Sequence, residues 1–269
     1  VEQARQRTWH QLALLAKTRG PLLGFPERYG GEGDVGGSVT AFETLGHGDL
    51  SLLVKSGVQW GLFGGAILHL GTEKHHERYL RRMMDLDLPG CFAMTETGHG
   101  SDVQSLRTTA VRDGDDWVVN GQKTWTTLGQ YADWIFCLVR TDPTVEKRQE
   151  GISFLLMDMK TPGITVRPLI LMDGGHSVNE VFFDDVQVPA ENLVHKEGKG
   201  WTVAKYLLGY ERMNTGRIGE SKRERRFAAP GAAGQERQAH QSFPVSRAPT
   251  RIGTTTNVPL SLNTFTDAP

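Results

Sequence analysis

The sequence has only two cysteines, Cys91 and Cys137, among its 269 residues. So few cysteines exclude a scaffold held together by disulfides. Because both stand in apolar runs, we expect free, buried thiols in a reducing compartment. Strong charge of either sign is also absent. The formal net charge of −1 leaves no field that would attract nucleic acid or an anionic membrane.

Long apolar runs are missing as well. The best candidate for a membrane span, "SGVQWGLFGGAILHLG", contains Gln59 and His69 and is shorter than the roughly 20 residues needed. The sequence starts at Val1 without a charged and then apolar leader, so it shows no secretion signal. We therefore expect a cytoplasmic protein of bacterial type, without a membrane span or a nucleic-acid partner. An organellar location is compatible with the same observations.

The sequence does show clear changes of pattern along the chain. Residues 1–88 are predicted to be helical, as in "EKHHERYLRRMMDLDL", where apolar residues recur at three- and four-residue steps. Residues 89–195 carry short β runs separated by turn signals, which predicts a barrel or a sandwich. A helical pattern resumes over 196–226, whereas 227–269 is rich in Ala, Pro, Ser, Thr and Gly without any period. The β runs are "GCFAMT", "TTAVR", "DWVVNGQKTW", "ADWIFCLVRT", "GISFLLMDM", "ITVRPL" and "VNEVFFDDVQV".

The predicted fold class is therefore α+β and multidomain. It comprises an N-terminal helical domain, a central β barrel or sandwich, the beginning of a C-terminal helical bundle and a disordered tail.

Two possible sites are better explained as ordinary structure. "GEGDVG" at 31–36 matches a dinucleotide-binding pattern, but Pro26 stands where the preceding strand is required, so a loop is predicted. His69, His75 and His76 are too poorly convergent for a metal site, and a solvated helix face is the preferred interpretation. No metal site is predicted.

Two other stretches favour a ligand site when they are taken together. "FAMTETGHGSD" leaves an apolar strand through a glycine loop, which can bring backbone N–H groups close to a flat, polar ligand. "NGQKTWTTLGQYADW" places a tryptophan next to two threonine hydroxyls. An aromatic face, hydroxyls and exposed amides suit a heteroaromatic ring.

At these residues the chain resembles the acyl-CoA dehydrogenase and acyl-CoA oxidase superfamily of flavoproteins. The resemblance runs from "LLGFPERYGG" to "YERMNTGRIGESKRE" and covers about four-fifths of the chain. Its further markers are "GISFLLMDMKTPGITVRP", "VNEVFFDDVQVPAENLV" and "GKGWTVAKYLL". It implies FAD between a central β domain and C-terminal helices, an acyl-CoA substrate, and an electron-transfer flavoprotein or oxygen as the electron acceptor. It also implies a homodimer or homotetramer.

The resemblance also implies which residues bind. Thr95 and Ser101 would hydrogen-bond the flavin, Trp125 would pack on its ring, and Thr127 would approach its hydride-accepting nitrogen. Ser101 and Arg212 would contact the acyl-CoA. The full set of expected cofactor-binding residues is Phe92, Ala93, Met94, Thr95, Glu96, Thr97, Gly98, His99, Gly100, Ser101, Trp125, Thr126 and Thr127.

The sequence departs from the family pattern in two ways. Thr97 and His99 replace the usual proline and alanine, so that the first half resembles the oxidase branch and the middle resembles the dehydrogenase branch. The family's catalytic base is a carboxylate of the C-terminal helical domain, whose pattern stops near Arg226, so no catalytic residue is assigned. The expected function is FAD-dependent α,β-dehydrogenation of acyl-CoA, by a chain that is incomplete. The alternatives are an acyl-CoA oxidase that passes electrons to oxygen and a non-catalytic remnant.

Overall fold

The computed structural model describes residues 2–209 and 211. Residues 1, 210 and 212–269 lie outside this description. The predicted tail (227–269), Arg212 and much of the predicted segment 196–226 therefore fall on residues that are not described.

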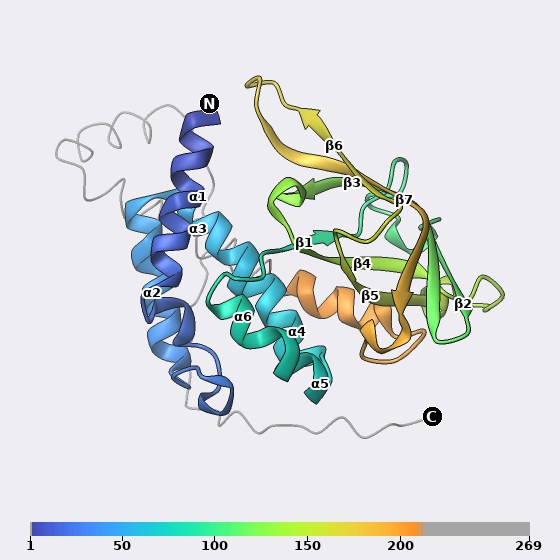
Figure 1. Ribbon diagram of the computed structural model, residues 1–269, viewed down its shortest axis with the longest axis horizontal. Coiled ribbons are helices and arrows are strands. Elements are labelled where there is room, and N and C mark those ends of the chain that lie inside the picture. Colours follow the sequence, from blue (N-terminus) through green and yellow to red (C-terminus); the bar gives the residue numbers. More distant parts are fainter. Residues whose placement is uncertain (1, 210, 212–269) are drawn as a thin grey trace, which may run out of the picture. The chain divides into compact units, whose positions relative to one another are not determined.

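Helices occupy the chain up to residue 84, as the sequence predicts (Figure 1). Two of them continue through π-helical turns: α3, η3 and α4 follow one another without a break over residues 50–70, and α5, η4 and α6 do so over 73–84. The helical elements are α1 (Glu2–Ala16), α2 (Val35–Gly48), α3 (Leu50–Ser56), η3 (Gly57–Gly64), α4 (Gly65–Leu70), α5 (Glu73–His75), η4 (His76–Leu80) and α6 (Arg81–Met84).

The starts of these helices are set by local side chains. The Asp34 carboxylate accepts the N–H of Gly37 at the start of α2 (2.7 Å), and Asp49 accepts the N–H groups of Ser51 and Leu52 at the start of α3. Such contacts satisfy backbone donors that a helix cannot pair internally. In the stretch "GEGDVG", residues 31–34 form a loop and Val35 and Gly36 begin α2, so the prediction of a loop is confirmed for the first four residues.

Eight strands form one mixed sheet in the order β6-β7-β3-β2-β4-β5-β8, with β1 paired in parallel to β4. The seven β runs predicted from the sequence correspond to β1–β7, while the two-residue β8 was not predicted. The strands are β1 (Gly90–Ala93), β2 (Thr109–Asp113), β3 (Asp116–Thr127), β4 (Trp134–Arg140), β5 (Ile152–Asp158), β6 (Ile164–Ile170), β7 (His176–Pro189) and β8 (Leu193–Val194). The α+β fold with N-terminal helices and a central sheet is therefore confirmed.

Both faces of the sheet are buried along its central strands β4 and β5. Along β4, Phe136 and its alternate neighbours join a cluster with the helices, and Cys137 joins a second cluster on the opposite face. The second cluster combines side chains of β3 and β7 with those of β1, β4 and β5, so the sheet curls over it. Residues 200–209 and 211 are helical, and Val203, Ala204 and Leu207 pack into the first cluster. The helices and the sheet thus share one core.

The expected solvated face for the histidines is wrong for two of them. His75 is 3% exposed and His76 is 9% exposed. The His75 Nδ1 accepts the Thr72 N–H (3.1 Å), and its Nε2 donates to the Glu191 carbonyl (2.8 Å). These two contacts require a neutral imidazole, and burial favours the neutral form by lowering the pKa of His75. Helix periodicity alone did not reveal that this face packs against the segment after β7.

Both cysteines are free and fully buried, as predicted. Within residues 2–209 and 211, no helix combines the length and the apolar character needed to cross a bilayer. The same residues hold no group of three or more His, Cys, Asp or Glu side chains arranged to bind a metal.

Candidate functional site

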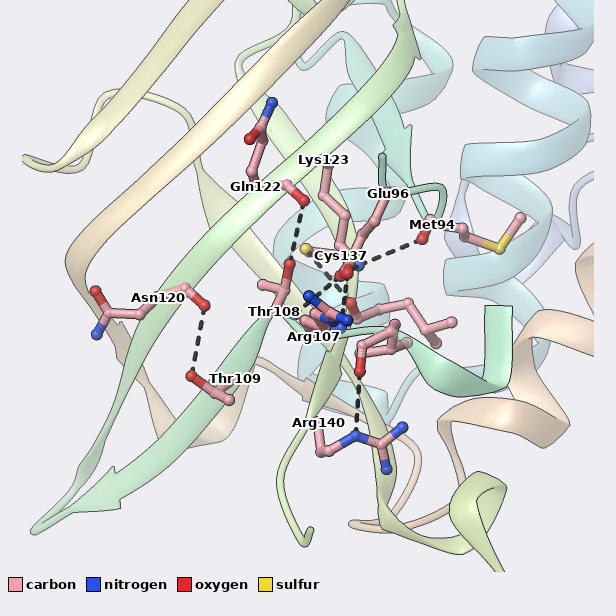
Figure 2. A network of polar contacts seen from close by, with 12 residues as sticks. Met94, Glu96, Arg107, Thr108, Thr109, Asn120, Gln122, Lys123, Cys137 and Arg140 are labelled. Atoms are coloured by element: carbon pink, nitrogen blue, oxygen red, sulfur yellow. Dashed lines mark hydrogen bonds and ion pairs between the residues drawn. The ribbon is translucent and has the colours of Figure 1, made fainter. Parts of the chain in front are cut away.

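The two motif stretches singled out from the sequence meet directly. β1 ends at Ala93, and the chain leaving it is joined to β3 by a hydrogen bond from the Thr124 N–H to the Thr95 carbonyl (2.9 Å). Figure 2 shows the polar network beneath this junction. The stretches are about 30 residues apart in sequence, so it is the fold that creates a single site.

A buried ion pair fastens the junction. The Lys123 ammonium lies 2.7 Å from Glu96 Oε1, with the two side chains 0% and 6% exposed, and it also donates to the Met94 carbonyl (3.3 Å). Glu96 in turn accepts the backbone N–H groups of Arg107 (2.6 Å) and Thr108 (2.9 Å). One lysine and one glutamate thus connect the exit of β1, the approach to β2 and the middle of β3 (Figure 2).

The ionised form of Glu96 is stabilised by this network. Burial by itself would raise the pKa of Glu96, but the Lys123 charge and the three hydrogen bonds together hold it below its ordinary value. Because both carboxylate oxygens are used internally, the Glu96 side chain is not available to a ligand. Glu96 is one of the expected cofactor-binding residues, but its side chain holds the protein's own strands and loop together.

Trp125 is presented to the solvent by a β-bulge. The pairing of β3 with β7 slips between Lys123 and Thr126, and Trp125 takes a left-handed backbone conformation (φ 60°). Its side chain is 58% exposed, whereas its neighbours Thr124 and Thr126 are buried. A bulge of this kind redirects one side chain out of the regular alternation. Here it leaves a large aromatic face uncovered by the described residues.

The hydroxyl of Thr126 is buried and has no hydrogen-bond partner among the described residues. Such an orphaned polar atom is costly and calls for an explanation. Thr127, one residue further, is half-buried. Trp125, Thr126 and Thr127 therefore combine an exposed ring with an unsatisfied donor and acceptor.

The loop after Glu96 exposes its backbone. The His99 N–H donates to the Glu96 carbonyl (3.0 Å), and this tight turn contains Gly98 in a left-handed conformation (φ 86°) with no atom near the place of a side chain. Thr97, Gly98, Gly100 and Ser101 are exposed, and Thr95 and His99 are half-buried. This loop can offer amide and hydroxyl groups to a ligand.

The remaining predicted residues belong largely to the core. Ala93 is fully buried, and the Phe92 ring lies near those of Phe136 and Phe154 (centroid distances 6.1 and 5.7 Å). Met94 is half-buried against the same cluster. The structure thus brings together 92–101 and 125–127 but gives their side chains different surroundings. Arg212 lies outside the described residues.

Sequence reasoning missed Lys123. It stands at the same strand parity as Trp117 and Val119, both of which are buried, so the alternation along "DWVVNGQKTW" already indicated an inward-facing lysine. An inward-facing lysine needs a carboxylate partner. The nearby motif contains one, Glu96.

A cavity of about 910 Å³ lies elsewhere, among the N-terminal helices. It is lined mainly by apolar side chains, and none of its lining residues belongs to the two motif stretches. The polar groups described above lie at the motif junction, so we place the candidate site there.

Comparison with known proteins identifies a family for both the helical part and the β part of the chain. The model described as "Acyl-CoA dehydrogenase, N-terminal domain" matches residues 3–87, and that described as "Acyl-CoA dehydrogenase, middle domain" matches residues 91–186. The second match spans both motif stretches.

Individual relatives agree. Acyl-CoA dehydrogenase IpdE1 of Mycobacterium tuberculosis H37Rv is 38% identical over 210 residues, 77% of this chain and 53% of the relative. The mitochondrial short-chain specific acyl-CoA dehydrogenase of Rattus norvegicus is 33% identical, over 78% of this chain and 48% of its own length. The crystal structure of an acyl-CoA dehydrogenase from Geobacillus kaustophilus matches with a TM-score of 0.73 and 35% identity, over 79% of this chain and 56% of that one.

The chain thus spans about half the length of the curated relatives it matches. From the two family matches, these relatives and the shared fold, we conclude that the chain belongs to the acyl-CoA dehydrogenase family.

Proposed function

We propose that this chain is the flavin-facing part of an FAD-dependent acyl-CoA dehydrogenase, with FAD held by residues 92–101 and 125–127. Members of the family are flavoprotein oxidoreductases. The observation that carries the proposal is the junction at which Thr124 and Lys123 bind Thr95 and Glu96 beside the exposed Trp125.

The residues at this junction fit a flavin. A flat heteroaromatic ring would cover the exposed face of Trp125, and the half-buried Thr127 could present its hydroxyl to the polar edge of the ring. The glycine loop at 98–100 leaves room for a close approach of backbone amides. These are features of the described residues and do not depend on the family.

Each residue has a distinct expected role. Thr95 and Ser101 would hydrogen-bond the flavin, Thr127 would donate to it, and Ser101 would also contact the acyl-CoA thioester. When bound, FAD supplies the acceptor for the β-hydride of the substrate. Glu96 keeps its carboxylate turned inward, so we assign it no proton transfer. We assign the base that removes the α-proton to none of the described residues.

The finer organisation follows the same proposal. We propose a helical domain over 1–88, a β domain of barrel or sandwich type over 89–195, and the start of a C-terminal helical domain over 196–226. The whole protein would be a homodimer or homotetramer that uses an electron-transfer flavoprotein as its acceptor. Thr97 and His99, in the exposed loop, favour an acyl-CoA oxidase as the second candidate. Hydrogen peroxide formation in the presence of acyl-CoA would distinguish this candidate from the first.

The proposal can be tested by titrating the purified chain with FAD in a calorimeter. We expect weak, saturable binding that is lost in Trp125→Ala and largely kept in Trp125→Phe. Val111→Ala is the matched control, because Val111 is an exposed apolar residue (64%) on β2, outside both motif stretches. Wild type without detectable binding, or Trp125→Ala binding as well as wild type, would contradict the proposal.

A further inference from the structure

Two bulky residues close to each other have left-handed backbone conformations. Trp125 has φ 60° and Leu128 has φ 61°, and neither is a glycine. Such conformations are unfavourable for residues with large side chains and persist only where the surrounding structure imposes them. The segment 125–128 must therefore be held by contacts outside itself.

The side chain of Asn179 on β7 provides these contacts. Asn179 is 0% exposed and stands opposite Thr126 in the β3–β7 register. Its Nδ2 donates to the Thr126 carbonyl (3.0 Å) and to Gln130 Oε1 (2.7 Å). Its Oδ1 lies 2.7 Å from His176 Nε2. Because an amide oxygen can only accept, His176 must donate from Nε2, and every polar group of Asn179 is then used.

Neighbouring residues of β7 close the network. Gln130 Nε2 donates to the His176 carbonyl (3.1 Å), and the Leu128 N–H donates to the Ser177 carbonyl (3.0 Å). Gly129 fits directly beside the amide, since an added Cβ would lie 3.2 Å from Asn179 Nδ2. Thr126 and Gln130, which lie on either side of Leu128, are therefore both hydrogen-bonded to β7.

We infer that Asn179 is a positioning residue for the flavin site: through the Thr126 carbonyl and Gln130, it imposes the bulged conformation that turns Trp125 outward. The inference rests on the proposed function for its link to FAD. The structural part of it concerns only described residues and can be tested without a ligand.

The same pair of strands offers a matched control. A second bulge lies between Val119 and Gly121, where Asn120 Nδ2 donates to Asp185 Oδ1 (2.9 Å) and the Asp185 N–H donates to Asn120 Oδ1 (3.0 Å). Asp185 also has a left-handed conformation (φ 48°). Asn120 thus anchors a comparable irregularity that contains no residue of the proposed site.

The test is amide hydrogen exchange on wild type, Asn179→Ala, Asn179→Asp and Asn120→Ala. Asn179→Asp keeps the acceptor for His176 but removes both donated hydrogen bonds. Both Asn179 variants should accelerate exchange at residues 126–131 by about tenfold or more, as expected when buried hydrogen bonds are lost, with β4 unchanged. Asn120→Ala should leave 126–131 as in wild type.

Unchanged exchange at 126–131 in the Asn179 variants, or equal acceleration throughout the sheet, would overturn the inference. If Asn179→Ala does not fold, Gln130→Ala gives the same test, because Gln130 is only half-buried. FAD titration of the same proteins separates the two proposals. Wild type without FAD binding contradicts the proposed function alone, whereas normal FAD binding by Asn179→Ala contradicts the positioning role.

Discussion

Lys123 connects β3 to the segment that follows β1. It is the fully buried cation that joins the two motif stretches, and its partner Glu96 holds two further backbone amides. Removing one member of a buried ion pair leaves the other charged and uncompensated, which is far more destabilising than removing both. The pair is therefore a sensitive point of the candidate site.

We predict that Lys123→Met lowers the free energy of unfolding by about 3–5 kcal/mol at pH 7, measured in urea. Adding Glu96→Gln to this variant should recover part of the loss, since a neutral amide can still accept a backbone N–H. Lys160→Met is the control: Lys160 lies 2.9 Å from Asp133 but is 79% exposed, so stability should hardly change. Equal losses for Lys123→Met and Lys160→Met would show that the buried pair is not special.

The same pair predicts a pH dependence. A carboxyl group whose pKa is lowered on folding contributes stability above its unfolded pKa, and this contribution is lost as the pH falls through the folded pKa. Glu96 is such a group. Lys123→Met removes the charge and one of the hydrogen bonds that lower the pKa of Glu96 but keeps the burial that raises it, so we expect Glu96 to take up a proton more readily on acidification. We therefore expect the difference in unfolding free energy between wild type and Lys123→Met to shrink from pH 7 to about pH 4.5, near an ordinary glutamate pKa. A difference that stays constant over this range would contradict the assignment.

Among individual residues, sequence reasoning selected those whose chemistry suits a ligand and missed those that hold the proposed site in place. The sequence singled out Trp125 and its threonines because ring and hydroxyl chemistry can be recognised from residue type. Lys123 and Asn179 were missed because their importance depends on partners 27 and 53 residues away, Glu96 and Thr126. Strand alternation could have indicated that Lys123 faces inward, whereas the contact of Asn179 with Thr126 becomes visible only when β3 and β7 are paired.

Among the elements, the start of β1 depends on a side chain from the helices. Gln59, in the π-helical η3, accepts the Gly90 N–H and donates to the Gly90 carbonyl, both at 2.8 Å, and is 3% exposed. An added Cβ on Gly90 would collide with the Phe63 ring, so the strand lies tightly against this helix. One glutamine thus replaces two hydrogen bonds that the strand end would otherwise need.

We predict that Gln59→Met destabilises the protein by about 2–4 kcal/mol, because two buried backbone groups lose their partner. The measurement is urea unfolding. Gln122→Met serves as the control, since Gln122 is half-buried and donates only to the Glu180 side chain (3.0 Å). A Gln59 variant no less stable than the Gln122 variant would mean that water or another group replaces these bonds.

The periodicity of the sequence predicted the helices and strands, but it did not predict the bulges that interrupt the strands. The runs of β type correspond to β1–β7 because alternation and turn residues are local signals. The two bulges in the β3–β7 pair, the short β8 and the burial of His75 and His76 depend on distant packing, which no local pattern encodes. The proposed site lies at one of these irregularities, the bulge at Trp125.

On the scale of the molecule, the N-terminal helices, one face of the sheet and Val203, Ala204 and Leu207 share one hydrophobic cluster, and a second cluster lies on the other face of the sheet. The described residues thus form a stable platform, yet the chain covers only about half the length of its curated relatives. In the described part, the carboxylate nearest the motif junction, Glu96, is committed to structural contacts. The platform that we propose for the cofactor therefore has no assigned catalytic base among the described residues.

We predict that the 269-residue chain binds FAD too weakly to retain more than a little of it through purification, and that it shows no measurable acyl-CoA oxidation. A positioned base typically contributes about 10²–10⁴-fold to such a reaction, and Trp125 is left 58% exposed where a bound ring would need a second wall. The measurements are the absorbance of the preparation near 450 nm and turnover of butyryl- or palmitoyl-CoA with an artificial acceptor, after added FAD. A yellow preparation with turnover would contradict the prediction. Glu211→Gln would then be the first variant to make, because Glu211 is an exposed carboxylate at the end of the described helix.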